Sequence, residues 1–355
     1  MDNQKEEFAF EELQALNSNI KSAQGVPDEL RNRMTQMLQR LERMAKLGHY
    51  ATEFDNISHY IETVLQIPWS STTKDRLDLN AVREALDRNH YGMQGVKDRI
   101  LEYMSSMILL NQRGKESEAR PPILLFVGLQ GVGKTTLAIS MAEALERKFV
   151  RIAMGGIGSP FELRGRSKAY PEAEPGQIVK ALMKTGVRNP LILLDEIEKA
   201  SGEAGLRNDI MAILLEILDP SQNKEFRDHY IDYPVDLSGV LFVCSANNTG
   251  TISTALMDRM EVIKMPSYTD NEKITIAKDY LFPKIIEKSG LREGELQIDP
   301  NLWPGIVRPF GFDTGIRSLG RTLESICRKV AKEIVEGKTE SVYLTADNLK
   351  YYLPK

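Results

Sequence analysis

The sequence predicts an α/β protein in which helices cover both faces of a parallel sheet. A helical segment precedes the sheet and a smaller helical domain follows it. Short apolar segments rich in Val, Ile, Leu and Phe alternate with helical segments through the middle of the chain, and amphipathic helices occupy both ends. The 355 residues, 42% of them hydrophobic and 27% charged, are typical of a soluble protein with two or three domains and a sizeable core.

Composition excludes several classes of protein. The net charge of -4 and the isoelectric point of about 5.8 argue against a dedicated nucleic-acid binder. Cys244 and Cys327 show no disulfide or zinc pattern, which favours a reducing cytoplasm. The polar N-terminus does not resemble a signal peptide, and no apolar run approaches the ~18 residues of a membrane helix, so we expect no membrane partner.

The first 70 residues are predicted to be helical. Apolar side chains recur three and four residues apart at Leu30, Met34, Met37, Leu38, Leu41 and Met44. The methionines are consistent with either an adaptable partner surface or the core of a helix bundle. The polar connector "PWSSTTKDRLD" marks a boundary, and we expect three domains: a helical segment at 1–70, an α/β domain at 71–268 and a helical domain at 269–355.

The α/β domain is expected to contain strands at 123–128, 149–154, 191–195 and 240–245. From about residue 270 the sequence predicts helices without further strands. In the longest of these helices one apolar face is made by Ile316, Leu319, Leu323, Ile326, Val330 and Ile334.

A phosphate-binding loop is predicted directly after the first strand. "GLQGVGKT" matches the pattern G-x-x-x-x-G-K-[ST] and precedes a helical segment. Glycines let backbone N–H groups turn toward phosphate oxygens, and the helix N-terminus adds a positive dipole end. Lys134 can reach the β- and γ-phosphates of ATP or the phosphates of ADP, and the Thr135 hydroxyl can ligate Mg²⁺. The expected nucleotide-binding residues are Gly128, Gln130, Gly131, Val132, Gly133, Lys134, Thr135 and Thr136.

Two acids end the third predicted strand in "LILLDEIEK". Asp195 can hold Mg²⁺ directly or through water. Glu196 can activate an attacking water, because hydrolysis needs a base as well as a metal. A pair of solvated acids is the alternative, but the four apolar residues before them argue against it. The two motifs together indicate a nucleotide hydrolase.

Further motifs resemble those of AAA+ ATPases: "VCSANN", "LMDRMEVI" and "GIRSLGR". From about residue 10 to the end, the chain is similar to the ATPase module of Lon proteases. This resemblance implies that Asn247 is a sensor for the attacking water, that Arg317 is a second sensor and that Arg259 is an arginine finger acting on a neighbouring subunit. A finger in trans implies a homo-hexameric ring. The resemblance also places three residues beside the adenine: His90, Tyr91 and Gly92.

The loop "RGRSKAYPEAEPG" matches the substrate-gripping pore loop of that family, with Tyr170 as the gripping aromatic and Pro171 after it. Packing of Tyr170 into its own loop is the alternative. The usual aliphatic residue after the tyrosine is replaced by Pro171, and the acids Glu172 and Glu174 are gained.

The resemblance implies an ATP-driven unfoldase or translocase of unfolded or misfolded polypeptides, with a role in protein quality control. No G-P-S-A-G nucleophile motif occurs, so we expect no peptidase site. An excised part of a Lon protease and a stand-alone ATPase both fit this expectation. Two other functions stay open: a nucleotide-gated scaffold that recruits a separate protease, and a nucleic-acid remodelling ATPase, which the acidic composition disfavours.

Overall fold

The computed structural model describes residues 2–45, 51–114, 123–170, 172–200, 204–308 and 316–354. The protein divides into two compact units. The first unit comprises Met1–Asp78, Ser106–Leu125 and Met141–Glu261, and the second comprises Leu79–Ser105, Phe126–Ser140 and Val262–Lys355. The chain therefore passes back and forth between the units and does not complete one before it begins the other.

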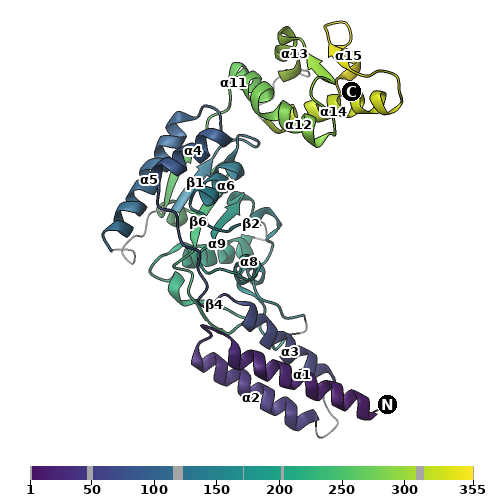
Figure 1. Cartoon of the computed structure of the whole chain (residues 1–355). Helices are drawn as coiled ribbons and strands as arrows, with labels where there is room; N and C mark the ends of the chain where they lie inside the picture. Colours follow the sequence, from purple (N-terminus) through teal and green to yellow (C-terminus); the bar gives the residue numbers. More distant parts are fainter. Residues whose placement is uncertain are drawn as a thin grey trace. The chain divides into compact units, whose positions relative to one another are not determined.

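Three helices begin the first unit and pack against one another: α1 (Asp2–Ser22), α2 (Asp28–Ala45) and α3 (Ala51–Gln66) (Figure 1). Gly25 adopts a positive φ of 74° between α1 and α2, a conformation that glycine reaches without a Cβ clash. The predicted apolar stripe of α2 is confirmed, because Leu30, Met34, Leu38 and Leu41 are all buried. Met34 thus belongs to the core of a helix bundle.

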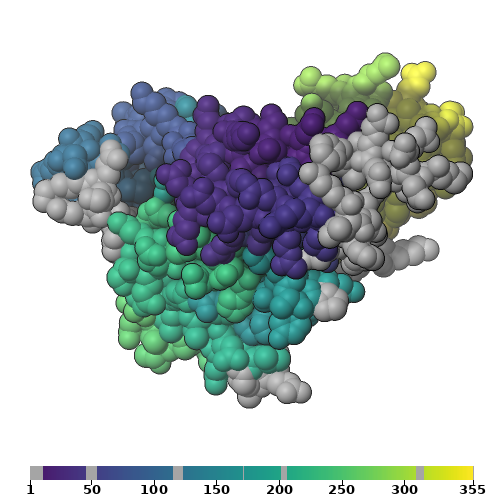
Figure 2. Space-filling view, turned by 90° about the horizontal axis from the view of Figure 1, so that it is seen from below, coloured from purple at the N-terminus to yellow at the C-terminus, as the bar shows by residue number. Residues whose placement is uncertain are grey.

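This helical bundle contacts a short hairpin of the same unit. The hairpin pairs β4 (Phe226–Asp228) with β5 (Tyr233–Val235) in antiparallel register. The buried Tyr60 of α3 donates its hydroxyl to the carbonyl oxygen of Ile231 at 3.0 Å, and its ring meets Tyr230 edge-on. Figure 2 looks onto the outer surface of these purple helices. The helical segment is therefore anchored through its third helix.

The central sheet has five strands in the order β2-β3-β6-β1-β7. The strands are β1 (Ile123–Val127), β2 (Phe149–Ala153), β3 (Leu191–Asp195), β6 (Leu241–Ala246) and β7 (Met260–Lys264). β3 pairs in parallel with β2 and with β6, and both β3 and β6 are buried along their whole length. Continuous apolar strands of this kind are typical of a sheet covered on both faces, so the predicted α/β class is confirmed.

Helices precede the first strand and connect the strands that follow (Figure 1). The longer ones are α4 (Leu79–Asn89), α5 (Gln94–Gln112), α6 (Lys134–Ala144), α8 (Gln177–Thr185) and α9 (Ala204–Leu218). The shorter ones are η1 (Met154–Gly156), α7 (Pro160–Arg164), η2 (Ile197–Lys199), η3 (Asn223–Glu225) and α10 (Thr254–Met257). Parallel strands joined in this way end at the same edge of the sheet, which brings the residues that follow β3 and β6 together.

The C-terminal part of the second unit is a helical lid with its own core. Its helices are α11 (Asp270–Thr275), the π-helix η4 (Ile276–Leu281), α12 (Phe282–Lys288), η5 (Pro300–Leu302), α13 (Trp303–Val307), α14 (Ile316–Val335) and α15 (Leu349–Tyr352). The predicted face of α14 is confirmed: Leu319, Leu323, Ile326 and Val330 are buried in the lid core, and Ile316 and Ile334 are packed against it.

The expectation that no strands follow residue 270 is wrong. β8 (Leu296–Ile298) and β9 (Val342–Leu344) pair in parallel within the lid. Each is only three residues long, too short for alternation of apolar and polar residues to become visible in the sequence. In the part of the chain that the structure describes, no helix is both long and apolar enough to span a bilayer.

Candidate nucleotide-hydrolysis site

The phosphate-binding loop follows β1 and leads into α6, which begins at Lys134. Gly131 and Gly133 adopt positive φ angles of 85° and 101°, which only glycine reaches without strain. A Cβ at Gly128 would lie 2.8 Å from the backbone oxygen of Met265, so this glycine permits close packing. Val132 is buried, Thr135 is half-buried, and Gln130 and Thr136 are exposed.

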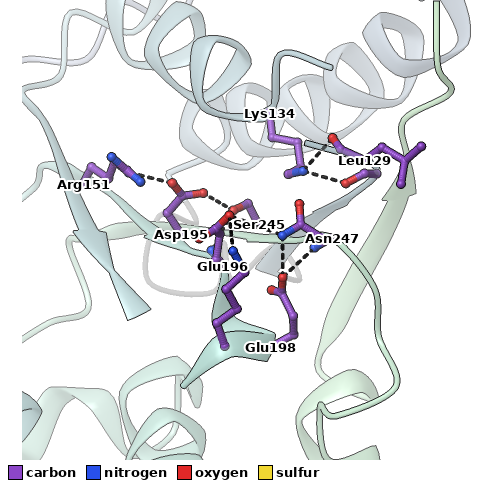
Figure 3. A network of polar contacts seen from close by, with 10 residues as sticks. Leu129, Lys134, Arg151, Asp195, Glu196, Glu198, Ser245 and Asn247 are labelled. Carbon is purple, nitrogen blue, oxygen red and sulfur yellow. Dashed lines mark hydrogen bonds and ion pairs between the residues drawn. The ribbon is translucent and has the colours of Figure 1, made fainter. Parts of the chain in front are cut away.

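The Lys134 side chain lies against its own loop. Its Nζ donates to the carbonyl oxygens of Gly128 at 2.6 Å and Leu129 at 3.0 Å (Figure 3). These two carbonyl groups hold the Lys134 ammonium group at the start of the phosphate-binding loop. A phosphate would replace them with charged oxygens, which bind an ammonium more strongly.

His90 lies against the phosphate-binding loop. It is buried, its Nε2 lies 3.2 Å from the Ser140 hydroxyl, and a Cβ at Gly133 would lie 3.7 Å from its Nδ1. Burial lowers the pKa of His90 to about 4, so the imidazole is neutral at pH 7. In this structure His90 packs against the phosphate-binding loop, and its place beside the adenine stays a prediction.

Tyr91 and Gly92 lie in the loop after α4, beside residues of the lid. The half-buried Tyr91 ring is 6.2 Å from the ring of Tyr280 in η4. Gly92 has a φ of 65°, and a Cβ there would lie 3.1 Å from a Glu272 carboxylate oxygen.

The lid also approaches the phosphate-binding loop at α14. The backbone N–H of Ile316 donates to the Gly131 carbonyl oxygen at 3.2 Å. The exposed Arg317 follows directly at the start of α14. The helix that carries the expected second sensor is therefore anchored to the loop that would hold the phosphates.

The first unit places the two acids of "LLDE" at the end of β3. The buried Asp195 accepts from Arg151 Nε at 2.6 Å on one carboxylate oxygen and from the Ser245 hydroxyl on the other (Figure 3). The same Ser245 oxygen accepts the Glu196 N–H at 3.0 Å. Ser245 of β6 therefore links the ends of the two strands through hydrogen bonds with Asp195 and Glu196.

Glu196 turns sharply out of the strand with a φ of 59°, in the left-handed region that is unusual for glutamate. Its carboxylate accepts from Lys199 Nζ at 2.9 Å and from Asn247 Nδ2 at 3.3 Å. Such backbone strain is kept where neighbouring groups fix it, and it occurs often at functional sites. The structure thus brings the expected base and the expected sensor into contact.

The oxygen donors of this chain fit Mg²⁺. The expected ligands Thr135 and Asp195 belong to different units, so their joint binding of the ion stays a prediction. Both Asp195 oxygens already accept a hydrogen bond, and each retains one lone pair. Mg²⁺ prefers oxygen ligands and keeps several waters, so it needs no dedicated cage. The described residues contain no cluster of three metal-binding side chains.

Arg259, the expected arginine finger, forms an ion pair within its own chain. Its Nη2 lies 2.8 Å from Asp219 Oδ2, and its side chain is 39% exposed. The other oxygen of Asp219 accepts from the backbone N–H and the hydroxyl of Ser221. These hydrogen bonds, followed by the Arg259 charge, lower the pKa of Asp219. Asp219 therefore stays ionised and can hold the arginine at the surface.

Tyr170 is 65% exposed, and both its gripping role and the alternative of packing on the surface of its own loop stay predictions. Pro171 lies outside the described residues. The buried Asp228 closes the base of this loop: its carboxylate accepts the Gly176 N–H at 2.7 Å, and a Cβ at Gly165 would lie 2.6 Å from it. Burial raises the pKa of Asp228 to about 6, although three backbone N–H donors oppose the rise.

Sequence reasoning missed five residues of these sites. They are Arg151, Glu198, Asp219, Asp228 and Ser245. A signal existed for two of them, because Arg151 interrupts an apolar strand and Ser245 lies beside Asn247 in "VCSAN". The others depend on neighbours distant in the sequence.

Comparison with family models shows which domains the chain contains. Residues 124–267 match the family model of the "ATPase family associated with various cellular activities (AAA)", and residues 287–342 match the "Lon protease AAA+ ATPase lid domain". The chain therefore contains an AAA ATPase domain followed by a Lon lid, and the AAA domain implies binding and hydrolysis of ATP.

Individual relatives define the family further. The chain is 44% identical to a Lon protease of Desulforamulus reducens over 89% of its length, and 40% identical to that of Brevibacillus choshinensis over 99%. These matches cover 38% and 46% of the two relatives. The chain is therefore homologous to Lon proteases over nearly its whole length, and it spans about two fifths of the curated relatives it matches.

Proposed function

We propose that this protein couples Mg²⁺-dependent ATP hydrolysis to the unfolding and translocation of polypeptides through the pore of a six-membered ring in the cytoplasm. Unfolded or misfolded polypeptides are its substrates, and its own residues carry no peptidase site. It serves either as the motor part of ATP-dependent proteolysis or as a stand-alone unfoldase.

The contact of Glu196 with Asn247 carries the hydrolytic part of this proposal. The Glu196 carboxylate takes a proton from the attacking water, and Asn247 orients that water. Lys134 and the loop N–H groups neutralise charge on the phosphates, and Arg317 adds charge from the lid. Arg259 lies at the surface of its own chain, where it can reach a neighbouring subunit, which is the reason for proposing a ring.

The exposure of Tyr170 supports polypeptide as the cargo. An aromatic ring contacts varied side chains without a specific hydrogen-bonding partner, which suits a non-specific grip. The Asp228 contacts fix the base of the loop while the tip stays accessible, so movement of the protein can be transmitted to the aromatic ring.

Glu196→Gln tests the hydrolytic assignment. The variant should bind ATP with unchanged affinity and lose nearly all turnover, because glutamine keeps the shape but cannot accept the proton. Binding is measured by calorimetry and turnover by phosphate release. Glu225→Gln, at an exposed carboxylate of the same unit, is the matched control. Near wild-type hydrolysis by Glu196→Gln would refute the assignment of the base.

Tyr170→Ala tests the cargo. It should keep basal ATPase activity and lose both substrate-stimulated ATPase and unfolding of a tagged test protein. Tyr170→Phe should retain both, and Tyr343→Ala controls for loss of an exposed tyrosine elsewhere. Unchanged unfolding by Tyr170→Ala would contradict a polypeptide motor. Salt-sensitive binding of single-stranded nucleic acid would favour a nucleic-acid remodeller, and absence of any hydrolysis would favour a scaffold.

A further inference from the structure

Glu198 lies two residues after the proposed base and is only 7% exposed. It belongs to η2, and its Oε1 accepts two hydrogen bonds from one residue of the neighbouring strand end: the Asn247 N–H at 3.0 Å and Asn247 Nδ2 at 2.7 Å (Figure 3). The Nδ2 contact is shorter than that to Glu196, at 3.3 Å. Glu198 is therefore the principal partner of the proposed sensor.

A carboxylate in this place selects one orientation of the Asn247 amide. A carboxylate group only accepts hydrogen bonds, so the donating NH₂ group of Asn247 must face the oxygens of Glu198 and Glu196. A flipped amide would place its carbonyl oxygen against negatively charged oxygens. The carbonyl oxygen Oδ1 of Asn247 is consequently held on the side away from Glu198.

That orientation suits a water bound between Glu196 and Asn247. Such a water can donate one hydrogen to the Glu196 carboxylate and the other to Asn247 Oδ1. Its lone pair then stays available for attack on phosphorus while the proton passes to Glu196. With the amide flipped, the NH₂ group would instead donate to one of the two lone pairs of the water and make the water a weaker nucleophile.

The burial of Glu198 is costly for folding alone. Its second oxygen, Oε2, is buried without a hydrogen-bond partner among the residues that the structure describes. An incompletely paired buried carboxylate is rare and calls for an explanation. A neutral hydrogen bond already connects this turn to the segment after Asn247, because the Thr251 hydroxyl donates to the Glu198 carbonyl oxygen at 2.9 Å. A charged side chain is therefore unnecessary for joining the two segments.

We propose that Glu198 is a positioning residue for ATP hydrolysis, which holds the Asn247 amide with its carbonyl oxygen toward the attacking water. The inference rests on the proposed roles of Glu196 and Asn247. It assigns to the last acid of "DEIE" a role through Asn247, without contact with the nucleotide.

An exchange of the carboxylate and amide groups between residues 198 and 247 tests this inference. Asn247→Asp removes the donor and places a carboxylate against Glu198, so kcat should fall about 100-fold with ATP affinity little changed. Adding Glu198→Gln lets the glutamine Oε1 keep the backbone N–H of residue 247 while its Nε2 donates to one oxygen of the aspartate, which leaves the other oxygen as the acceptor for water. The double variant should recover about tenfold in kcat, although Glu198→Gln alone should lower the wild-type rate. Both changes nearly conserve volume, so folding is little disturbed.

Glu198→Met is the complementary variant, because it fills the same space without an acceptor. It should lower kcat at least tenfold with an unchanged dissociation constant for ATP. Thermal unfolding of each variant separates loss of fold from loss of positioning. A folded double variant without recovery would overturn the inference, as would near wild-type turnover by Glu198→Met. If Glu196→Gln is inactive while the pair shows no coupling, only this inference fails and the proposed function stands.

Discussion

Asp219→Asn is expected to weaken hydrolysis in a neighbouring subunit without changing the variant's own nucleotide site. Asp219 Oδ2 lies 2.8 Å from Arg259 Nη2, and Oδ1 accepts from Ser221. Asparagine can keep its oxygen on Ser221, but its NH₂ group then faces the Arg259 guanidinium and repels it. The finger would lose its preferred orientation while its charge remains.

Exposure of Arg259 limits the size of this effect. Its side chain is 39% exposed, so water screens the ion pair with Asp219 and reduces it to about 1 kcal/mol or less. That free energy corresponds to about a fivefold change in the fraction of correctly placed Arg259. Removal of the guanidinium itself by Arg259→Ala should cost ~10³-fold or more if it stabilises the transition state in trans.

The assay compares phosphate release by both variants, alone and mixed with Lys134→Ala. Arg259→Ala should be nearly inactive alone and regain activity on mixing, because each variant supplies what its neighbour lacks. Asp219→Asn should retain at least a tenth of wild-type activity. Equal losses in the two variants would refute the positioning argument. An assembled mixture without recovery would refute action in trans.

Two further predictions concern the base of the Tyr170 loop. Because the folded-state pKa of Asp228 is raised from 3.8 to about 6, folding takes up a proton between these values. The stabilisation by protonated Asp228 is therefore complete below pH 3.8 and is lost as pH rises through about 6. The free energy of unfolding, measured with urea, should fall by at most about 3 kcal/mol over this range. Asp228→Asn should not show this dependence on pH. Gly176→Ala would place a Cβ 2.0 Å from the Leu163 carbonyl oxygen and should destabilise by about 3 kcal/mol, whereas Gly156→Ala, with no atom within 4 Å, should leave the melting temperature unchanged.

Local patterns in the sequence predicted much of the fold. The four long strands were found within one residue at either end, because short and mainly apolar runs between helices are a local signal. β7 is buried only at Met260 and Ile263 and lies within the motif "LMDRMEVI", so its strand character was overlooked. β4, β5, β8 and β9 have three residues each, and their pairing depends on distant segments.

The phosphate-binding loop and "LLDE" were predictable for a similar reason, since their chemistry lies in consecutive residues. The contact between Glu196 and Asn247 also follows from topology, because parallel strands end at one edge. The role of Glu198 does not follow in this way. In "DEIEK" it reads as a solvated acid in a turn, and only the position of the β6 end shows that it is buried against Asn247.

Asp228 shows the same limit at the Tyr170 loop. The glycines and prolines of "RGRSKAYPEAEPG" predict an exposed loop, but they do not show what holds its two ends together. That contact comes from a hairpin more than fifty residues later, where the Asp228 carboxylate receives the Gly176 N–H. A carboxylate can close the base only if it is buried among backbone donors, and burial is decided by packing. Hence the exposed tip of this loop could be predicted from its residues, whereas the rigid base that would let Tyr170 transmit force could not.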